Sequence, residues 1–159
     1  MILIALGSNL PFAGKSPREI LDAAIDAMSH EQIAVIARSR FYTTAPSPPS
    51  DQPRFMNAVV RVETSLAPEE LMHRLHAIED RFGRKRGEPN AARSLDIDLL
   101  DYDGRVMNGG LILPHPRLSG RGFVLLPLAE VAPNWLHPVT GQGVAGLIAA
   151  LPPQDARPI

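Results

Sequence analysis

Hydrophobic and polar residues follow one another along this chain in patterns that predict both strands and helices. Ile2 to Leu6 is a short apolar run ended by Gly-Ser-Asn, which indicates a buried strand. Ser16-Pro17-Arg18-Glu19 is a capping-box pattern, and the residues after it are apolar at helical spacing. A second stripe of this kind, from Leu71 to Phe82, follows Pro68. Both stripes are therefore predicted to be helices.

Strand-like stretches surround these two helices. We expect further strands over residues 33–44, 55–63 and 94–100, short strands around Ile112 and Phe123, and a helix over 143–151. Asp103-Gly104 is typical of a hairpin turn. The order strand-helix-strand-strand-helix-strand predicts an α+β, ferredoxin-like sandwich, in which an antiparallel sheet carries two helices on one face.

The length and composition favour one folded unit. The chain has 159 residues, no cysteine and a formal net charge of -1. We expect a single domain over residues 1–159, with residues 153–159 loose. The charge gives no general attraction to nucleic acid, and no apolar run approaches the length of a membrane span. The N-terminus has no signal-peptide pattern, so the expected location is the cytoplasm.

Two aspartates stand at alternate positions in Asp96-Ile97-Asp98. Alternate side chains of a strand share a face, so the two carboxylates are predicted to lie together. Magnesium prefers one or two carboxylates together with water and substrate phosphates, and it would relieve their repulsion. The alternative is a solvated strand face with two unrelated acids.

Cationic residues gather directly before this strand. Arg81, Arg84, Lys85, Arg86 and Arg93 all precede Asp96. Guanidinium groups bind phosphate oxygens in pairs, and cations beside metal-binding acids are what phosphoryl-type transfer requires. The alternative is a solvated helix end, which we favour for Arg81.

A third candidate is His115, which stands between two prolines and is followed by Arg117, Arg121 and Phe123. It is suited to donate to a phosphate, and an equally good alternative is a partly exposed structural histidine. The sequence contains no Walker-type phosphate loop, no nucleophile elbow and no protein-kinase motif set, and its ALGSNL segment has a single glycine and is weak as a phosphate cradle.

Eight segments in order resemble one enzyme family, 6-hydroxymethyl-7,8-dihydropterin pyrophosphokinase of folate biosynthesis. The similar segments are ALGSNL (5–10), FYTTAP (41–46), DQPRFMNAV (51–59), ETSLAPEELM (63–72), FGRKR (82–86), RSLDIDLL (93–100), PHPRL (114–118) and RGFVLLPL (121–128). The resemblance implies the ferredoxin-like fold and a reaction in which the pterin hydroxymethyl oxygen attacks the β-phosphorus of ATP and AMP leaves. It covers residues 3 to 133.

The resemblance also implies roles for individual residues. The implied metal ligands, for two magnesium ions, are Asp96 and Asp98. The implied charge-stabilising residues are Arg84 and Arg93, and the implied ATP ligands are Arg86, Arg93, His115 and Arg121. The implied pterin ligands are Thr44, Ser47, Phe55, Asn57 and Phe123. Flat heterocycles bind well between aromatic faces, which suits Phe55 and Phe123, although core packing is their alternative role.

Some positions depart from the family pattern: residues 88–92, Ser94, Gly110, Ile112 and Phe55. These departures bear on nucleotide affinity and loop closure, and they make a catalytically inactive member the main rival hypothesis. An RNA-binding or regulatory module is the other rival; aromatic residues are 5% of the chain, and the acidic strand would repel a phosphate backbone. We expect loops 45–53 and 83–92 to close over substrates. The expected partners are ATP and the pterin alone, and the expected state is a monomer.

Overall fold

The computed structural model describes residues 1–46, 49–83 and 92–159. Its elements in chain order are β1 (Ile2–Ser8), α1 (Pro17–Met28), η1 (Ser29–Glu31), β2 (Ala34–Arg38), β3 (Tyr42–Thr44), β4 (Phe55–Glu63), α2 (Pro68–Arg81), β5 (Asp96–Tyr102), β6 (Met107–Asn108), β7 (Ile112–Leu113), η2 (Leu118–Gly120), α3 (Gly122–Val131), α4 (Val144–Ala149) and β8 (Ala156–Pro158).

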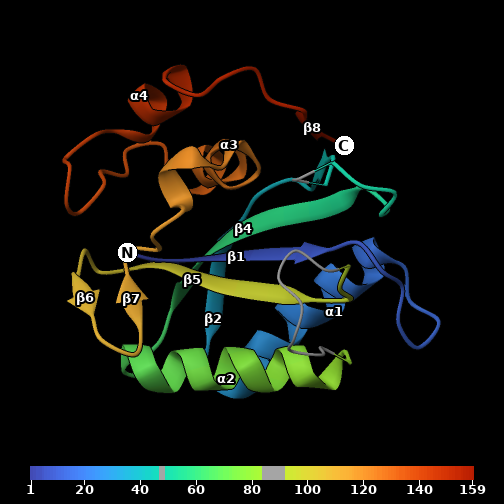
Figure 1. Ribbon diagram of the computed structural model, residues 1–159. Helices are drawn as coiled ribbons and strands as arrows, with labels where there is room; N and C mark the ends of the chain where they lie inside the picture. The colour runs from blue at the N-terminus through green and yellow to red at the C-terminus, as the bar shows by residue number, and fades with distance from the viewer. Residues whose placement is uncertain (47–48, 84–91) are drawn as a thin grey trace.

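The main sheet is antiparallel and has the strand order β5-β1-β4-β3-β8, with β2 also paired to β4 (Figure 1). β1 lies inside the sheet and all seven of its residues are buried. β4 is long enough to pair with β3 through its first residues and with β2 through its last. The single strand predicted over residues 33–44 is therefore two strands, separated at Ser39, whose Oγ accepts a hydrogen bond from the Val59 N–H.

Helices cover both faces of this sheet (Figure 1). One face packs on α1 and α2, and its core includes Ile4, Val60 and Ile97. The capping box of α1 is confirmed, because Ser16 Oγ accepts from the Glu19 N–H and Glu19 Oε1 accepts from the Ser16 N–H. The predicted two helices on one face are thus present, and the α+β fold class is confirmed.

The opposite face carries a layer that the sequence reading missed. α3 and α4 pack there on a second core that includes Leu3, Val59 and Leu100. The strand predicted around Phe123 is wrong, because Phe123 lies in the first turn of α3. This helix is apolar on nearly all sides since it is buried between the sheet and α4, so it has no helical polar-apolar period to detect.

The expectation of a loose C-terminal end does not hold for residues 156–158. They form β8 and pair with β3, with Thr44 opposite Ala156. This pairing covers the edge of β3, whose N–H and C=O groups would otherwise be open to other chains. The sequence did not predict β8, because a strand of three residues that ends in proline is too short to show an alternating pattern. The single-domain organisation stays a prediction.

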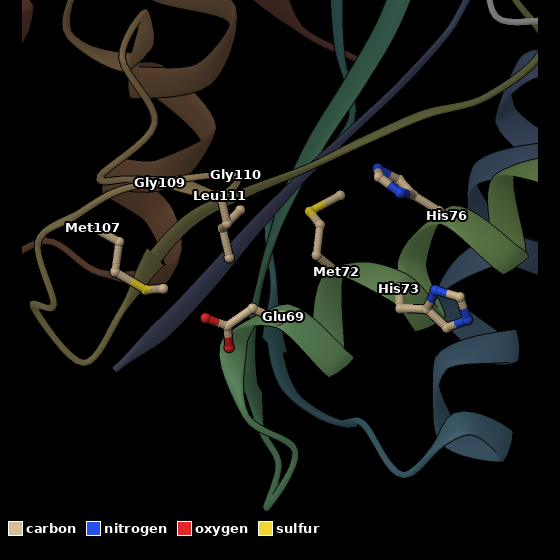
Figure 2. Close-up of a pocket in the computed structure, with 8 residues that line it drawn as sticks. All are labelled: Glu69, Met72, His73, His76, Met107, Gly109, Gly110 and Leu111. Atoms are coloured by element: carbon tan, nitrogen blue, oxygen red, sulfur yellow. The ribbon is translucent and has the colours of Figure 1, made fainter.

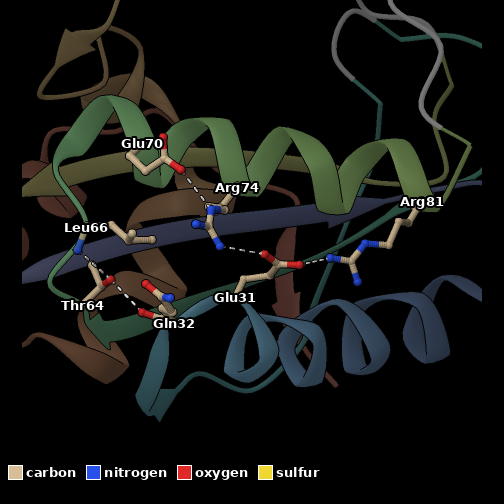
Figure 3. Close-up of polar contacts among 7 residues, drawn as sticks. All are labelled: Glu31, Gln32, Thr64, Leu66, Glu70, Arg74 and Arg81. Atoms are coloured by element: carbon tan, nitrogen blue, oxygen red, sulfur yellow. Dashed lines mark hydrogen bonds and ion pairs between the residues drawn. The ribbon is translucent and has the colours of Figure 1, made fainter.

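A polar cluster joins η1 to α2 on the helical side of the sheet (Figure 3). Glu31 accepts from Arg74, at 3.2 Å, and from Arg81, and Arg74 also contacts Glu70 one turn earlier, at 3.0 Å. Beside it, Thr64 Oγ1 donates to the Gln32 carbonyl. Among the described residues, no helix is long and apolar enough to cross a membrane.

Candidate active site

Asp96 and Asp98 lie on β5, at the outer side of the sheet next to β1. Ile97 and Leu99 point into the core under α2, so the two aspartates point to the α3 face, as the alternation predicts. Their side chains are 28% and 34% exposed, respectively. Two like charges are therefore held on one face, partly out of water.

Two of the predicted phosphate ligands contact this acid pair. Arg93 Nη1 lies 3.1 Å from Asp96 Oδ2, and His115 Nε2 lies 3.8 Å from Asp98 Oδ1. The structure thus brings together Asp96, Asp98, Arg93 and His115, which are separated by up to about twenty residues of chain.

His115 is held in one orientation by the backbone. Its own N–H donates to the Leu100 carbonyl, and its Nδ1 accepts from the Arg117 N–H. Burial, together with the charges of Arg121 and Arg117, lowers the pKa of His115 to about 4 against the opposing attraction of Asp96. The imidazole is therefore neutral near pH 7. Because Nδ1 is an acceptor, the ring proton is on Nε2, which faces Asp98.

Arg121 precedes α3 and is half-buried. Burial lowers its pKa from the ordinary value, and the neighbouring Arg117 adds to that effect. Its guanidinium carbon lies 5.3 Å from the centre of the Phe123 ring, in a cation–π contact. Arginine stays charged despite such shifts, so a cation is held beside one of the two predicted aromatic residues.

The predicted pterin residues share the sheet face of the acid pair. In the β-ladder, Gly7 stands opposite Asp96 on one side and opposite Asn57 on the other. A Cβ at Gly7 would lie 2.9 Å from Asn57 Oδ1, so only glycine leaves room for the Asn57 side chain to lie over β1. Asp96 and Asn57 are thus two strands apart, or about 10 Å between backbones.

Asn57 and Thr44 form a buried polar pair on this face. Asn57 Nδ2 donates to Thr44 Oγ1 at 2.9 Å, and both residues are buried. In the described ranges, no protein group donates a hydrogen bond to Asn57 Oδ1. Phe55 begins the same strand and Phe123 comes from α3, and both are half-exposed. A buried acceptor beside two available rings suits a flat, amide-bearing ring.

Three predicted site residues cannot be placed. Arg84, Arg86 and Ser47 lie outside the described residues, as do most of loop 83–92 and part of loop 45–53. The closure of these loops over substrates stays a prediction.

Asn9 is a central residue that the sequence reading missed. Its Nδ2 donates to Gln52 Oε1 and to the Pro53 carbonyl, both at 3.1 Å, and its Oδ1 accepts from the Arg93 N–H at 2.9 Å. The residue is 1% exposed. It therefore fastens the end of loop 45–53 to the residue that contacts Asp96. Only the fold reveals this role, because its partners lie more than forty residues away.

Glu79 on α2 also acts on the acid strand. It is 2% exposed, and its Oε2 accepts from the Ile97 N–H at 2.7 Å. This burial excludes the role of a solvated acid on the helix surface. The carboxylate instead fixes the backbone between Asp96 and Asp98.

A pocket of about 380 Å³ lies between α2 and the β6–β7 hairpin (Figure 2). Its lining residues are Glu69, Met72, His73, His76, Met107, Gly109, Gly110 and Leu111. Figure 2 shows Met72 and His76 projecting from α2 on the side of the hairpin strand. The chain leaves this pocket through β7 and reaches His115 two residues later, so one short segment connects the pocket on the α2 side to the acid site, whose aspartates point to the α3 face.

The acid pair fits magnesium better than a metal that needs a larger ligand set. The described ranges contain no group of three or more His, Cys, Asp or Glu residues placed around one point. Two carboxylates, with the remaining positions left to water and substrate phosphates, is the set that Mg²⁺ prefers.

Comparison with known proteins gives one consistent result. Residues 3–133 match the family model described as 7,8-dihydro-6-hydroxymethylpterin-pyrophosphokinase. A Pseudomonas aeruginosa protein named 2-amino-4-hydroxy-6-hydroxymethyldihydropteridine pyrophosphokinase is 39% identical over 95% of this chain and 91% of its own length. The Haemophilus influenzae protein of the same name is also 39% identical, over 85% of this chain and 83% of its own.

Longer proteins match as well. The "Folic acid synthesis protein fol1" of Pneumocystis carinii is 40% identical over 99% of this chain, which spans 21% of that protein. A crystal structure of wild-type Plasmodium falciparum HPPK-DHPS is similar with a TM-score of 0.72 and 14% identity, over 93% of this chain and 40% of that one. At that identity the likeness shows the fold.

Proposed function

This chain belongs to the 7,8-dihydro-6-hydroxymethylpterin-pyrophosphokinase family, and we propose that ATP, bound with Mg²⁺ at Asp96 and Asp98, is its pyrophosphoryl donor. The family's activity, pyrophosphoryl transfer to hydroxymethyldihydropterin in folate biosynthesis, is the function of this chain. The donor, the ions and the roles of individual residues are the proposal.

One observation carries the proposal: the ladder sets Asn57 and Asp96 opposite Gly7 on its two sides, so their side chains share one face of the sheet. This places a candidate phosphate site and a candidate pterin site on one surface, at the separation of two strands. Two Mg²⁺ ions held by Asp96 and Asp98 would offset the charge of the carboxylates and of the phosphate oxygens.

The basic residues suit the phosphates of ATP. Arg93 contacts a carboxylate of the pair, and a guanidinium is suited to bind phosphate oxygens two at a time. His115 is neutral and donates one hydrogen bond through Nε2, without adding charge. Arg121 holds its charge near the start of α3. Arg84 and Arg86 complete the proposed set from outside the described residues.

The pterin is proposed to bind with its polar edge on Asn57 and Thr44 and its faces toward Phe55 and Phe123. Ser47, in the adjoining loop, is proposed to contact it as well. In this pose the hydroxymethyl group points along the sheet face toward Asp96. Its oxygen bonds to the β-phosphorus and its hydroxyl proton is released to water, while the bond from that phosphorus to the oxygen of the α-phosphate breaks and AMP leaves.

The pocket beside α2 is the proposed site of the nucleoside. Met72, Met107 and Leu111 supply apolar surface, and its volume of about 380 Å³ is in the range of small-molecule sites. Gly110, one of the departures from the family pattern, lines it and contributes no polar side chain. We therefore expect ATP to be held mainly by its phosphates.

A direct assay separates this proposal from its rivals. The protein is mixed with ATP, Mg²⁺ and 6-hydroxymethyl-7,8-dihydropterin, and AMP is measured with and without excess chelator. We expect AMP that requires both the pterin and the metal. Absence of AMP would favour a catalytically inactive member, and AMP formation that survives chelation would remove the metal from the proposal. A monomeric, cytoplasmic enzyme that acts on small molecules and binds no nucleic acid stays a prediction.

A further inference from the structure

The C-terminal segment 154–158 touches both walls of the proposed pterin site. On the sheet side, β8 pairs with β3, and Ala156 stands opposite Thr44. On the helix side, the Gln154 side chain occupies the position that a Cβ at Gly122 would take, next to Phe123. This segment lies beyond residues 3–133, which match the family model.

Asp155 is the centre of these contacts. Its two carboxylate oxygens lie 2.9 and 3.3 Å from the two terminal nitrogens of Arg54, a two-point ion pair. The Arg54 side chain also donates from Nε to Thr43 Oγ1 at 3.0 Å. Arg54 lowers the pKa of Asp155 from its ordinary value, and the backbone N–H of Ala45 lowers it as well.

These partners stand at the two ends of one loop. Ala45 directly follows Thr44, and Arg54 directly precedes Phe55, so the loop between them carries Ser47 and connects two proposed pterin ligands. The C-terminal segment thus contacts both ends of the loop, through β8 beside Thr44 at one end and through the Asp155 ion pair with Arg54 at the other. Directly beside these contacts, β3 and β4 pair with Thr44 opposite Phe55. This pairing brings Thr44 Oγ1 to Asn57.

We propose that Asp155 and the segment 154–158 are positioning elements for the dihydropterin, which fix the spacing of loop 45–54 and of the first turn of α3. This inference rests on the proposed pterin site. It concerns pterin affinity alone, because none of these contacts reaches Asp96, Asp98 or the pocket beside α2 in the described ranges.

The chain offers a matched control. Arg38 and Asp22 form another ion pair, between β2 and α1, with side-chain exposures of 41% and 49%, and the Arg54–Asp155 pair has the same two values. Asp155→Asn and Asp22→Asn therefore remove surface pairs of equal exposure, and Asp155→Asn also removes the weaker contact of Asp155 with Arg157, at 3.7 Å. A purely structural role predicts equal effects of the two substitutions.

The test measures KM for each substrate and the melting temperature in both variants. We expect Asp155→Asn to raise KM for the pterin up to about fivefold, the upper range for an exposed pair, with KM for ATP unchanged. Asp22→Asn is expected to change neither constant, and both variants are expected to lose the same small amount of thermal stability. Removal of residues 154–159 is expected to raise KM for the pterin about tenfold or more, because β3 loses its neighbour.

The double exchange of Arg54→Asp with Asp155→Arg provides a second line of evidence, since it restores a pair of opposite charges. Its KM for the pterin is expected to fall below that of Asp155→Asn. Equal pterin constants in the Asp155 and Asp22 variants, or a parallel rise in both KM values, would overturn the inference. A wild-type protein that releases no AMP would instead overturn the proposed function.

Discussion

Two polar clusters of this protein arrange acidic and basic side chains in different ways. The cluster of Glu31, Arg74 and Arg81 joins one acid to two cations that stand two turns apart on α2 (Figure 3). The acid site on β5 instead holds Asp96 and Asp98 on one face, two residues apart. The first cluster joins η1 to α2, whereas the second brings like charges together.

The difference separates a structural site from a functional one. Opposite charges that satisfy one another within the fold need no ligand, and their net contribution is modest. Like charges held on one face raise the energy of the folded chain until a cation binds. The neutral state of His115, caused by its burial, adds a hydrogen-bond donor without adding charge. The β5 site is therefore the one suited to a metal.

The largest expected effect is the loss of activity in Asp98→Ala. We expect AMP release to fall about 10³-fold or more, because a metal that stabilises transition-state charge contributes several kcal/mol. The melting temperature is expected to stay close to that of the wild type, because Asp98 is 34% exposed on an outer strand of the sheet. AMP release at saturating Mg²⁺ and differential scanning calorimetry measure the two quantities. A rate within tenfold of the wild type would remove Asp98 from the metal site.

The next effect concerns the neutral polar pair on the same face. Asn57→Ala removes an amide from a buried site and leaves Thr44 Oγ1 without its donor. Loss of a hydrogen bond at a buried position costs about 1–3 kcal/mol, so KM for the pterin is expected to rise about tenfold. KM for ATP is expected to stay constant, which titration of each substrate would show. An equal rise in both constants would mean that Asn57 does not contact the pterin.

The sequence was sufficient to predict those parts of the fold and site that depend on local patterns. The capping box at Ser16, the alternation around Ile97 and the strand over residues 55–63 all reappear in the structure. Each depends on residues within one element, where period and capping chemistry determine the conformation.

Features that depend on distant parts of the chain escaped prediction. α3 lacks a polar face because two layers bury it, and β8 forms because β3 offers an open edge. Asn9 and Glu79 acquire their roles through partners that the fold brings to them, Arg93 and Ile97. The family resemblance named candidate ligands, and the ladder register explains why those on β4 and β5 share one surface.

The structural cluster is expected to respond through stability rather than activity. Glu31→Gln keeps the size of the side chain and removes its charge, so both ion pairs to α2 are lost. We expect the free energy of unfolding to fall by about 1–2 kcal/mol, or roughly 2–4 °C of melting temperature per kcal/mol. AMP release by the folded variant is expected to equal that of the wild type. A variant with normal stability and impaired AMP release would reverse the assigned roles of the two clusters.

The smallest effect separates the two arginines that share Glu31. Arg74 is 31% exposed and also contacts Glu70, whereas Arg81 is 50% exposed and makes one such contact. Arg74→Gln is therefore expected to lower the free energy of unfolding by about 1 kcal/mol, and Arg81→Gln by no more than about 0.5 kcal/mol. Urea denaturation of both variants measures the difference.

Arg81 ends α2 just before the residues proposed to bind phosphate. It is therefore the residue of the structural cluster that stands nearest to them in the sequence. An unchanged KM for ATP in Arg81→Gln would show that Arg81 belongs to the structural cluster. A clear rise in that KM would show that the phosphate site extends into the end of α2.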